Sequence, residues 1–199
     1  MTIQIDQITG LILAGGRGSR MGEADKGLQL LRGIPMALHA ITRLAPQVST
    51  LTISANRNVA AYEAFGVPVR PDEVGNFAGP LAGLQTALSY CSTEYLVTAP
   101  CDSPFLPLDL VAALGNGLSM QNADLAFAVT GINDMEQIHP VFCLLRTALL
   151  PDLNRYIGAG GRKITAWHAS LCAAKVHFSN EDAFQNINTL EDLRKFDKD

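Results

Sequence analysis

The chain has 199 residues, 48% of them hydrophobic, which favours a single domain over residues 1–199 with an ordinary apolar core. Its formal net charge of −4 argues against nucleic acid or an anionic membrane as the main partner, although a local group of cations can still bind a small anion. No apolar run approaches the roughly 20 residues that span a bilayer, and the N-terminal sequence lacks the pattern of a secretory signal.

Short apolar runs alternate with helical patterns along the chain. The strand candidates are Ile8–Ala14, Thr50–Ala55, Val67–Pro71, Tyr95–Ala99, Asp124–Val129 and Pro140–Leu145. The helix candidates are Met36–Ala45, Asn58–Phe65, Leu81–Tyr90 and Leu108–Leu118, with Pro80 and Pro107 at first-turn positions and a C-terminal helix after the N-cap Thr189. The alternation predicts an α/β fold: a Rossmann-like, doubly wound, mostly parallel sheet with helices on both faces.

Polar residues follow four of these strands, at the edge where open α/β sheets bind ligands. The first strand leads into LILAGGRGSRMGEADKGL, Leu11 to Leu28, which contains five glycines. It matches neither the dinucleotide fingerprint GxGxxG nor the Walker pattern GxxxxGK[ST]. We interpret it as a loop whose backbone N–H groups approach a nucleotide while Arg20 and Lys26 neutralise its phosphates. The alternative is a surface turn with solvated cations.

The other strand ends carry a carboxylate or an amide. Asp102 in Pro100-Cys-Asp102 follows an almost wholly apolar strand and suits Mg²⁺, although an aspartate also commonly begins a turn before proline. Asn56 and Asp72 follow the second and third strands. Their side chains match the donors and acceptor of guanine, and the alternative is an Asx turn at each strand end.

The cysteines are scattered, without a CxxC pair. This spacing predicts reduced thiols in a cytoplasmic protein and gives little support to a zinc site or a disulfide framework. Cys101 has no evident cationic neighbour to lower its pKa, so we interpret it as a packing residue. The four positions are Cys91, Cys101, Cys143 and Cys172.

Leu13-Ala-Gly-Gly-x-x-x-Arg-Met21, followed by Asp25-Lys-Gly-Leu28, resembles the N-terminal motif of nucleotidyltransferases with a nucleotide-diphospho-sugar transferase fold. The double glycine, the DKGL string and a GPLAG string at 79–83 resemble the molybdenum cofactor guanylyltransferases most, and the matches run from about residue 10 to 192. The first motif alone also fits cytidylyl and sugar-phosphate relatives. Glu23 stands where the family often has a second glycine, and this interpretation does not explain it.

The resemblance implies an Mg²⁺-dependent enzyme that transfers GMP from GTP to the terminal phosphate of a molybdenum-molybdopterin cofactor and releases pyrophosphate. It implies catalytic roles for Arg20, Lys26 and Asp102, with Asp102 as the metal ligand. Proteins that make or receive the cofactor would be its protein partners. The implied nucleotide contacts are Leu13, Ala14, Gly15, Gly16, Lys26, Asn56, Asp72 and Asp102.

The same resemblance places five residues near the second substrate, each with a structural alternative. The glycines can serve close helix–strand packing, the histidine can be a satisfied structural residue, and the asparagines can cap the terminal helix. The five residues are Gly79, Gly83, His139, Asn186 and Asn188. Segment 160–163 is a weaker candidate for an anion contact, and a solvated helix start is the simpler interpretation. Rival functions are a cytidylyl- or sugar-1-phosphate nucleotidyltransferase, or a nucleotide-binding adaptor without catalysis.

Overall fold

A seven-stranded mixed sheet forms the centre of the computed structural model, which describes residues 3–14, 25–72, 79–132 and 135–196. The strand order is β5-β4-β1-β6-β8-β7-β9. Strand β8 runs antiparallel to its neighbours β6 and β7, and the other neighbouring strands pair in parallel. The seven strands are β1 (Ile8–Leu13), β4 (Thr50–Ser54), β5 (Val69–Arg70), β6 (Tyr95–Pro100), β7 (Leu125–Thr130), β8 (Gln137–Arg146) and β9 (Ala173–His177).

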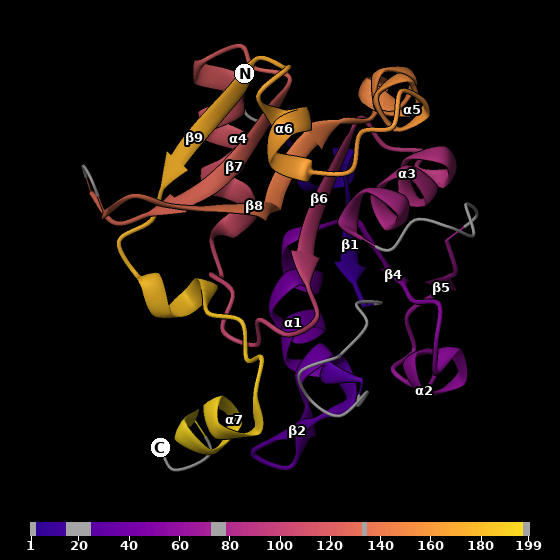
Figure 1. Cartoon of the computed structure of the whole chain (residues 1–199), viewed down its shortest axis with the longest axis vertical. Helices are drawn as coiled ribbons and strands as arrows, with labels where there is room; N and C mark the ends of the chain where they lie inside the picture. The colour runs from indigo at the N-terminus through magenta and orange to yellow at the C-terminus, as the bar shows by residue number, and fades with distance from the viewer. Residues whose placement is uncertain (1–2, 15–24, 73–78, 133–134, 197–199) are drawn as a thin grey trace.

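Helices cover both faces of this sheet (Figure 1). The α-helices are α1 (Met36–Leu44), α2 (Val59–Glu63), α3 (Pro80–Tyr90), α4 (Leu110–Met120), α5 (Leu150–Gly158), α6 (Ile164–His168) and α7 (Leu190–Phe196). A two-stranded ribbon, β2 (Leu30–Leu31) with β3 (Ile34–Pro35), stands apart from the main sheet. Among the described residues, no helix is long and apolar enough to cross a membrane.

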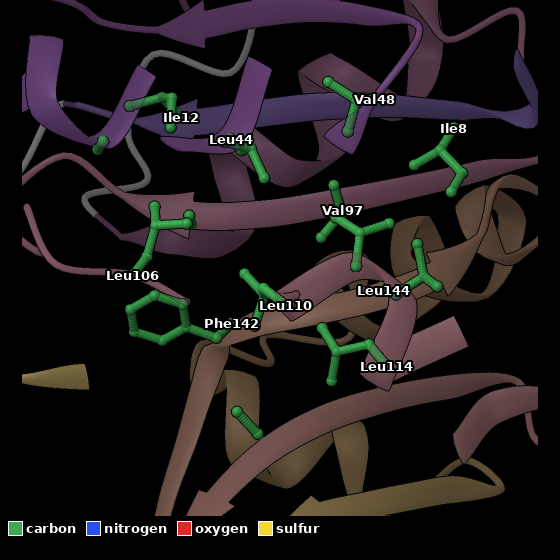
Figure 2. Packing of buried hydrophobic residues seen from close by; sticks show 14 of the residues in the cluster. Ile8, Ile12, Leu44, Val48, Val97, Leu106, Leu110, Leu114, Phe142 and Leu144 are labelled. Atoms are coloured by element: carbon green, nitrogen blue, oxygen red, sulfur yellow. The ribbon is translucent and has the colours of Figure 1, made fainter. Parts of the chain in front are cut away.

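The strand side chains alternate between two apolar layers, as the two-residue period of a strand requires. Ile8 and Ile12 of β1 belong to the layer under α1 and α4, whereas Leu11 belongs to the layer under α3, α5 and α6. Figure 2 shows the first layer, where Leu110 and Leu114 of α4 lie among strand residues. Because β1 and β6 are buried on both faces, their sequences read as continuous apolar runs.

The predicted strands and helices are present, with shifted ends. Pro80 is in the first turn of α3 as expected, but α4 begins only at Leu110, because Pro107 lies in the preceding turn and accepts a hydrogen bond from the Leu110 N–H. Thr189 caps α7: its Oγ1 accepts from the Asp192 N–H at 3.0 Å. The Asp192 carboxylate accepts in return from the Thr189 hydroxyl at 2.7 Å and from the Thr189 N–H, and these bonds lower the pKa of that carboxyl.

Several elements have no counterpart in the sequence-based prediction. These are β9, α5 and the β2–β3 ribbon. The helix start considered at 160–163 corresponds to α6, whose N-cap is Lys163. The strand expected at Pro140–Leu145 is longer, and a register shift between Phe127 and Ala128 bends its pairing with β7. The four cysteines are free thiols, and burial raises the pKa of the Cys143 thiol to about 11.

Candidate active site

A pocket of about 250 Å³ opens at the carboxyl ends of β1, β4 and β6. It is the place at which a doubly wound sheet binds ligands, because the loops that leave adjacent parallel strands separate there. Residues of eight segments line it: Leu13, Ala14, Asp25, Lys26, Ser54, Asn56, Asp72, Gly79, Pro80, Gly83, Pro100, Cys101, Asp102, Val141 and Asn186.

At one end of the pocket, Asn56 and Asp72 bind each other through two hydrogen bonds. The Asn56 amide donates to Asp72 Oδ2 at 2.7 Å, and the Asp72 backbone N–H donates to Asn56 Oδ1 at 2.7 Å. Ser54 Oγ donates to Asp72 Oδ1 at 2.8 Å, which sequence reasoning did not anticipate. The pair therefore presents a fixed carboxylate, which can accept hydrogen bonds, and one further amide N–H, which can donate one. These groups are complementary to a heterocyclic ring that carries two adjacent N–H donors beside a carbonyl acceptor.

At the other end, Lys26 lies between two side chains that are remote from it in sequence. Its Nζ is 3.3 Å from Asp102 Oδ2 and donates to Asn188 Oδ1 at 2.5 Å. The Lys26 side chain keeps 25% of its exposure, so its ammonium group faces the pocket as well as its partners. This is the geometry of a cation held where an anionic ligand would bind.

Asp102 is a desolvated carboxylate, 9% exposed, at the end of β6. Burial raises the pKa of its carboxyl, and the neighbouring Lys26 opposes that shift. Its backbone is anchored, because its carbonyl accepts from the Ile187 N–H at 2.9 Å. The next residue, Ser103, donates to Asn186 Oδ1 at 2.5 Å. The segment around Ile187 thus supports the loop that carries Asp102.

Where β1 reaches the pocket, its backbone groups are already hydrogen-bonded to neighbouring segments of the sheet. The Leu13 carbonyl accepts from the Cys101 N–H at 3.1 Å, and the Ala14 N–H donates to the Ser54 carbonyl at 2.8 Å. Of the backbone contacts predicted here, the Ala14 N–H is therefore not available to a phosphate. Gly15, Gly16, Arg20 and Glu23 lie outside the described residues.

Cys101 is a packing residue, as the sequence indicated. It is 8% exposed, and burial, with the neighbouring Asp102 and Asp25 carboxylates, raises the pKa of its thiol. The expectation that no cation lies nearby is wrong, because Lys26 acts to lower this pKa, but burial outweighs it. A thiol held protonated in this way is a poor nucleophile.

The structure requires glycine at the two glycine positions of the GPLAG string for different reasons. Gly79 is the N-cap of α3 with φ +151°, a conformation that side chains disfavour. A Cβ at Gly83 would lie 2.5 Å from Ser54 Oγ and 2.6 Å from Leu13 Cδ2. Gly83 therefore permits close packing of α3 on β1 and β4, and both glycines also line the pocket.

Of the remaining predicted residues, the histidine lies away from the pocket and the two asparagines lie near it. His139 is not in the pocket lining: its Nε2 is hydrogen-bonded to Thr130 Oγ1 at 2.8 Å, and its ring stacks on Phe184, so the structural alternative describes it. Burial lowers the pKa of its imidazole. Asn186 and Asn188 do reach the pocket region, where they bind Ser103 and Lys26.

The further anion contact considered at 160–163 is absent from the pocket lining. Arg162 Nη1 donates instead to the carbonyls of Ile157, at 3.2 Å, and Gly161. It therefore satisfies carbonyl groups at the C-terminal end of α5.

Sequence reasoning missed Asp25, which lines the pocket and binds two side chains of the α2 region. The signal was present in the DKGL string, where only Lys26 was given a role.

Fold and pocket together define a class. A mostly parallel sheet with helices on both faces and a pocket at the carboxyl ends of its strands is the architecture of the nucleotide-diphospho-sugar transferase fold. The pocket of this chain holds a lysine–aspartate pair and an amide–carboxylate pair. Comparison with known proteins makes this assignment more specific.

The MobA-like NTP transferase domain family matches residues 10–172. A molybdenum cofactor guanylyltransferase of Cupriavidus necator is 58% identical over 190 residues, which cover 95% of this chain and 96% of the relative. The chain belongs to the MobA-like NTP transferase family, within the molybdenum cofactor guanylyltransferases.

Solved structures agree on the fold. The molybdopterin-guanine dinucleotide biosynthesis protein A of Archaeoglobus fulgidus superposes with a TM-score of 0.73 at 22% identity, over 96% of this chain and 97% of that one. The 4-diphosphocytidyl-2C-methyl-D-erythritol synthase of Anaerococcus prevotii gives 0.76 at 12% identity, over 98% of both chains. These similarities concern the fold alone.

Proposed function

We propose that the chain transfers GMP from GTP to the terminal phosphate of a molybdenum-molybdopterin cofactor, with release of pyrophosphate. One observation carries the proposal: a single pocket has Lys26 and Asp102 at one end and Asn56 and Asp72 at the other. A nucleoside triphosphate has a charged end and a hydrogen-bonding base, and it would span these two pairs. Membership of the guanylyltransferase family supports guanine as the base.

The base end supports guanine on chemical grounds too. Guanine presents two adjacent donors, N1–H and N2–H₂, beside the O6 acceptor, and a carboxylate with a neighbouring amide N–H matches that order. Cytosine lacks a ring N–H donor at the corresponding position. Because the carboxylate of Asp72 is held by Ser54 and by Asn56, its orientation does not have to be established at the moment of binding.

At the phosphate end, the chain would act mainly by positioning and by offsetting charge. An oxygen of the acceptor phosphate forms a bond to the α-phosphorus of GTP, the bond to the β-phosphate oxygen breaks, and its electron pair leaves with pyrophosphate. Because the nucleophile is already anionic, no strong general base is required. Lys26 would neutralise charge on the phosphate oxygens, and we propose the same role for Arg20.

The residues present fit Mg²⁺. Among the described residues no group of three or more histidine, cysteine or acidic side chains is gathered, so the protein would supply at most two such ligands at Asp102. Mg²⁺ commonly binds through one or two carboxylates and completes its shell with water and substrate phosphates. When bound, the metal supplies a positive charge that polarises phosphate oxygens. Asp102 would hold it, and Lys26 would then turn from Asp102 toward the phosphates.

The decisive experiment is a thermal melt of the purified protein with GTP, CTP, ATP and UTP in the presence of Mg²⁺. At 100 times its Kd a ligand stabilises the native state by about 2.7 kcal/mol, which for a chain of this length raises Tm by roughly 5–10 °C. We expect that shift with GTP and much smaller shifts with the others. A larger shift with CTP or UTP would favour a cytidylyltransferase or a sugar-1-phosphate nucleotidyltransferase instead.

Release of pyrophosphate separates catalysis from binding. With labelled GTP, Mg²⁺ and a molybdopterin acceptor, the wild-type protein should release pyrophosphate, and Asp102→Ala should reduce that release by orders of magnitude while the protein stays folded. Protection by GTP without any release would support an adaptor. Near-normal release by Asp102→Ala would contradict the metal assignment.

A further inference from the structure

Asp25, the residue before Lys26, is bound on both carboxylate oxygens by side chains of the α2 region. Tyr62 donates its hydroxyl to Asp25 Oδ1 at 2.6 Å, and the Asn58 amide donates to Asp25 Oδ2 at 2.9 Å. Tyr62 is fully buried, so its hydroxyl has little freedom to exchange this bond for water. Asn58 precedes α2 in the left-handed region, with φ +51°. Both carboxylate oxygens of Asp25 are therefore held by side chains with defined positions.

Gly27, the residue after Lys26, is fixed by packing. A Cβ at this position would lie 2.4 Å from the Tyr62 hydroxyl oxygen and 3.1 Å from Cys101 Sγ, so only glycine lets the chain pass this close. Tyr62 thus contacts the residues on both sides of Lys26. With Asp25 and Gly27 held, the Lys26 backbone is held, and its side chain extends to Asp102 and Asn188.

The turn between β4 and α2 connects this contact to the other end of the pocket. Asn56 in that turn binds Asp72, and Asn58, two residues later, binds Asp25. One short turn therefore sets the position of the carboxylate at the base end and of the lysine at the phosphate end. Asn58 and Tyr62 do not themselves line the pocket.

We infer that Asn58 and Tyr62 are positioning residues for nucleotidyl transfer, because through Asp25 they hold Lys26 against Asp102 and Asn188. Asp25 is then a structural anchor of the lysine and is not a ligand of the nucleotide. The catalytic part of this inference rests on the proposed function, whereas the placement of Lys26 is measurable without it.

Two variants test the inference. Tyr62→Phe removes only the hydroxyl and keeps the buried ring, while Asn58→Gly removes the side chain and tolerates the left-handed backbone. Tyr156→Phe is the matched control, because it also removes a hydroxyl that donates a hydrogen bond, to the Lys163 carbonyl at 3.0 Å, but outside the pocket. Asn58 is exposed, so its replacement leaves the core intact even if Tyr62→Phe folds poorly.

The first readout is the acetylation rate of the Lys26 amine by acetic anhydride, measured by mass spectrometry. Lys175, which pairs with Glu136, is the internal reference. In both variants the Lys26 rate should rise roughly threefold or more relative to Lys175, since a released side chain reacts in proportion to its released population. The rate in Tyr156→Phe should match the wild type. An unchanged Lys26 rate in both variants would overturn the inference, whatever the enzymatic activity.

The second readout is kinetic. Misplacing Lys26 should lower kcat for pyrophosphate release by about 10- to 100-fold. In a Lys26→Ala background, Tyr62→Phe and Asn58→Gly should cause no further loss, because residues that act through one group are not additive. Additive losses would mean that the α2 contacts act on the general structure, and would overturn the positioning role. If the wild type released no pyrophosphate while Lys26 acetylation still rose in the variants, the proposed function alone would be wrong.

Discussion

At the scale of single residues, the site depends on a buried carboxylate and the lysine that accompanies it. Asp102 is desolvated, which raises the pKa of its carboxyl, and Lys26 at 3.3 Å favours the charged form. A carboxylate in this environment interacts strongly with any cation that replaces the lysine, because little water competes for it. The Lys26 ammonium group therefore favours the ionised form of this buried carboxyl.

Under the proposed function, Lys26→Ala should lower the rate of GTP-dependent pyrophosphate release by about 10²–10³-fold, since it would remove a charge that acts on the phosphates. Lys175→Ala is the control: it also breaks a lysine–carboxylate pair, with Glu136, but lies outside the pocket lining. Turnover assays of the two purified variants make the comparison. Equal activities would show that Lys26 has no special role.

His168 gives the protein a pH-dependent stability. It is 3% exposed, both ring nitrogens lack a hydrogen-bond partner among the residues that the structure describes, and burial lowers the pKa of its imidazole from 6.5 to about 4. Between these values the unfolded chain binds a proton that the folded chain does not, so stability is present above pH 6.5 and is lost as the pH falls toward 4. The loss should be on the order of 3 kcal/mol.

Urea unfolding at several pH values between 7 and 4 tests this, with His168→Leu as the comparison. The leucine variant removes the titrating group, so the free energy of unfolding should fall less steeply with acid than in the wild type. The difference in slope is the relevant quantity, because the substitution also changes packing against Phe127 and Trp167. Parallel pH curves would exclude His168 as the cause.

At the scale of elements, helix α3 illustrates how close packing and the pocket depend on each other. Its N-terminal Gly79 and its internal Gly83 both line the pocket, and Gly83 lets the helix approach β1 and β4. The helical period of this segment and its first-turn proline were readable from sequence. The contact that requires Gly83 was not, because it involves Leu13 and Ser54 in other elements.

Gly83→Ala should destabilise the protein by about 1–3 kcal/mol, because overpacking against Ser54 and Leu13 outweighs the gain in helix propensity of about 1 kcal/mol. Gly158→Ala in α5 is the matched helical control: nothing lies within 4 Å of its added Cβ, so stability should stay equal or rise slightly. Denaturant midpoints of both variants give the comparison. A Gly83→Ala protein as stable as the wild type would show that α3 can move away from the sheet at no cost.

At the scale of the whole molecule, two apolar layers share one sheet. Trp167 lies fully buried in the layer under α3, α5 and α6, while α1 and α4 cover the opposite layer. Because the same strands contribute to both layers, neither layer can be lost without exposing the other face of those strands. This arrangement favours one cooperative unit across the described part of the chain.

Thermal unfolding should therefore be a single transition. Trp167 is the only tryptophan, so its fluorescence reports one layer, and far-ultraviolet circular dichroism reports all helices and strands. The two midpoints should coincide. A fluorescence transition separated from the dichroism transition by several degrees would indicate two units.

Six of the seven strands of the main sheet, most helices and the main polar residues of the pocket were predictable from the sequence, for local reasons. A strand buried on both faces leaves a continuous apolar run, and polar residues directly after such runs must meet at one edge of a parallel sheet. Lys26, Asn56, Asp72 and Asp102 follow from that rule with the family resemblance. The five-residue β9 escaped prediction, and of the five-residue α6 only the start was considered, because elements this short leave little periodicity. Helix α5 was missed although Leu150, Leu153 and Ile157 lie at helical spacing in it.

What only the tertiary structure decided is which side chains bind one another across the chain. Lys26 meets Asn188 across 162 residues, Asp25 meets Tyr62 across 37, and β8 runs antiparallel between β6 and β7. A hydrogen bond between remote residues leaves no periodic trace in either segment, so no local pattern predicts it. The sequence by itself determined the kind of fold and the residue types of its pocket, whereas the tertiary structure determined how Lys26 is held there.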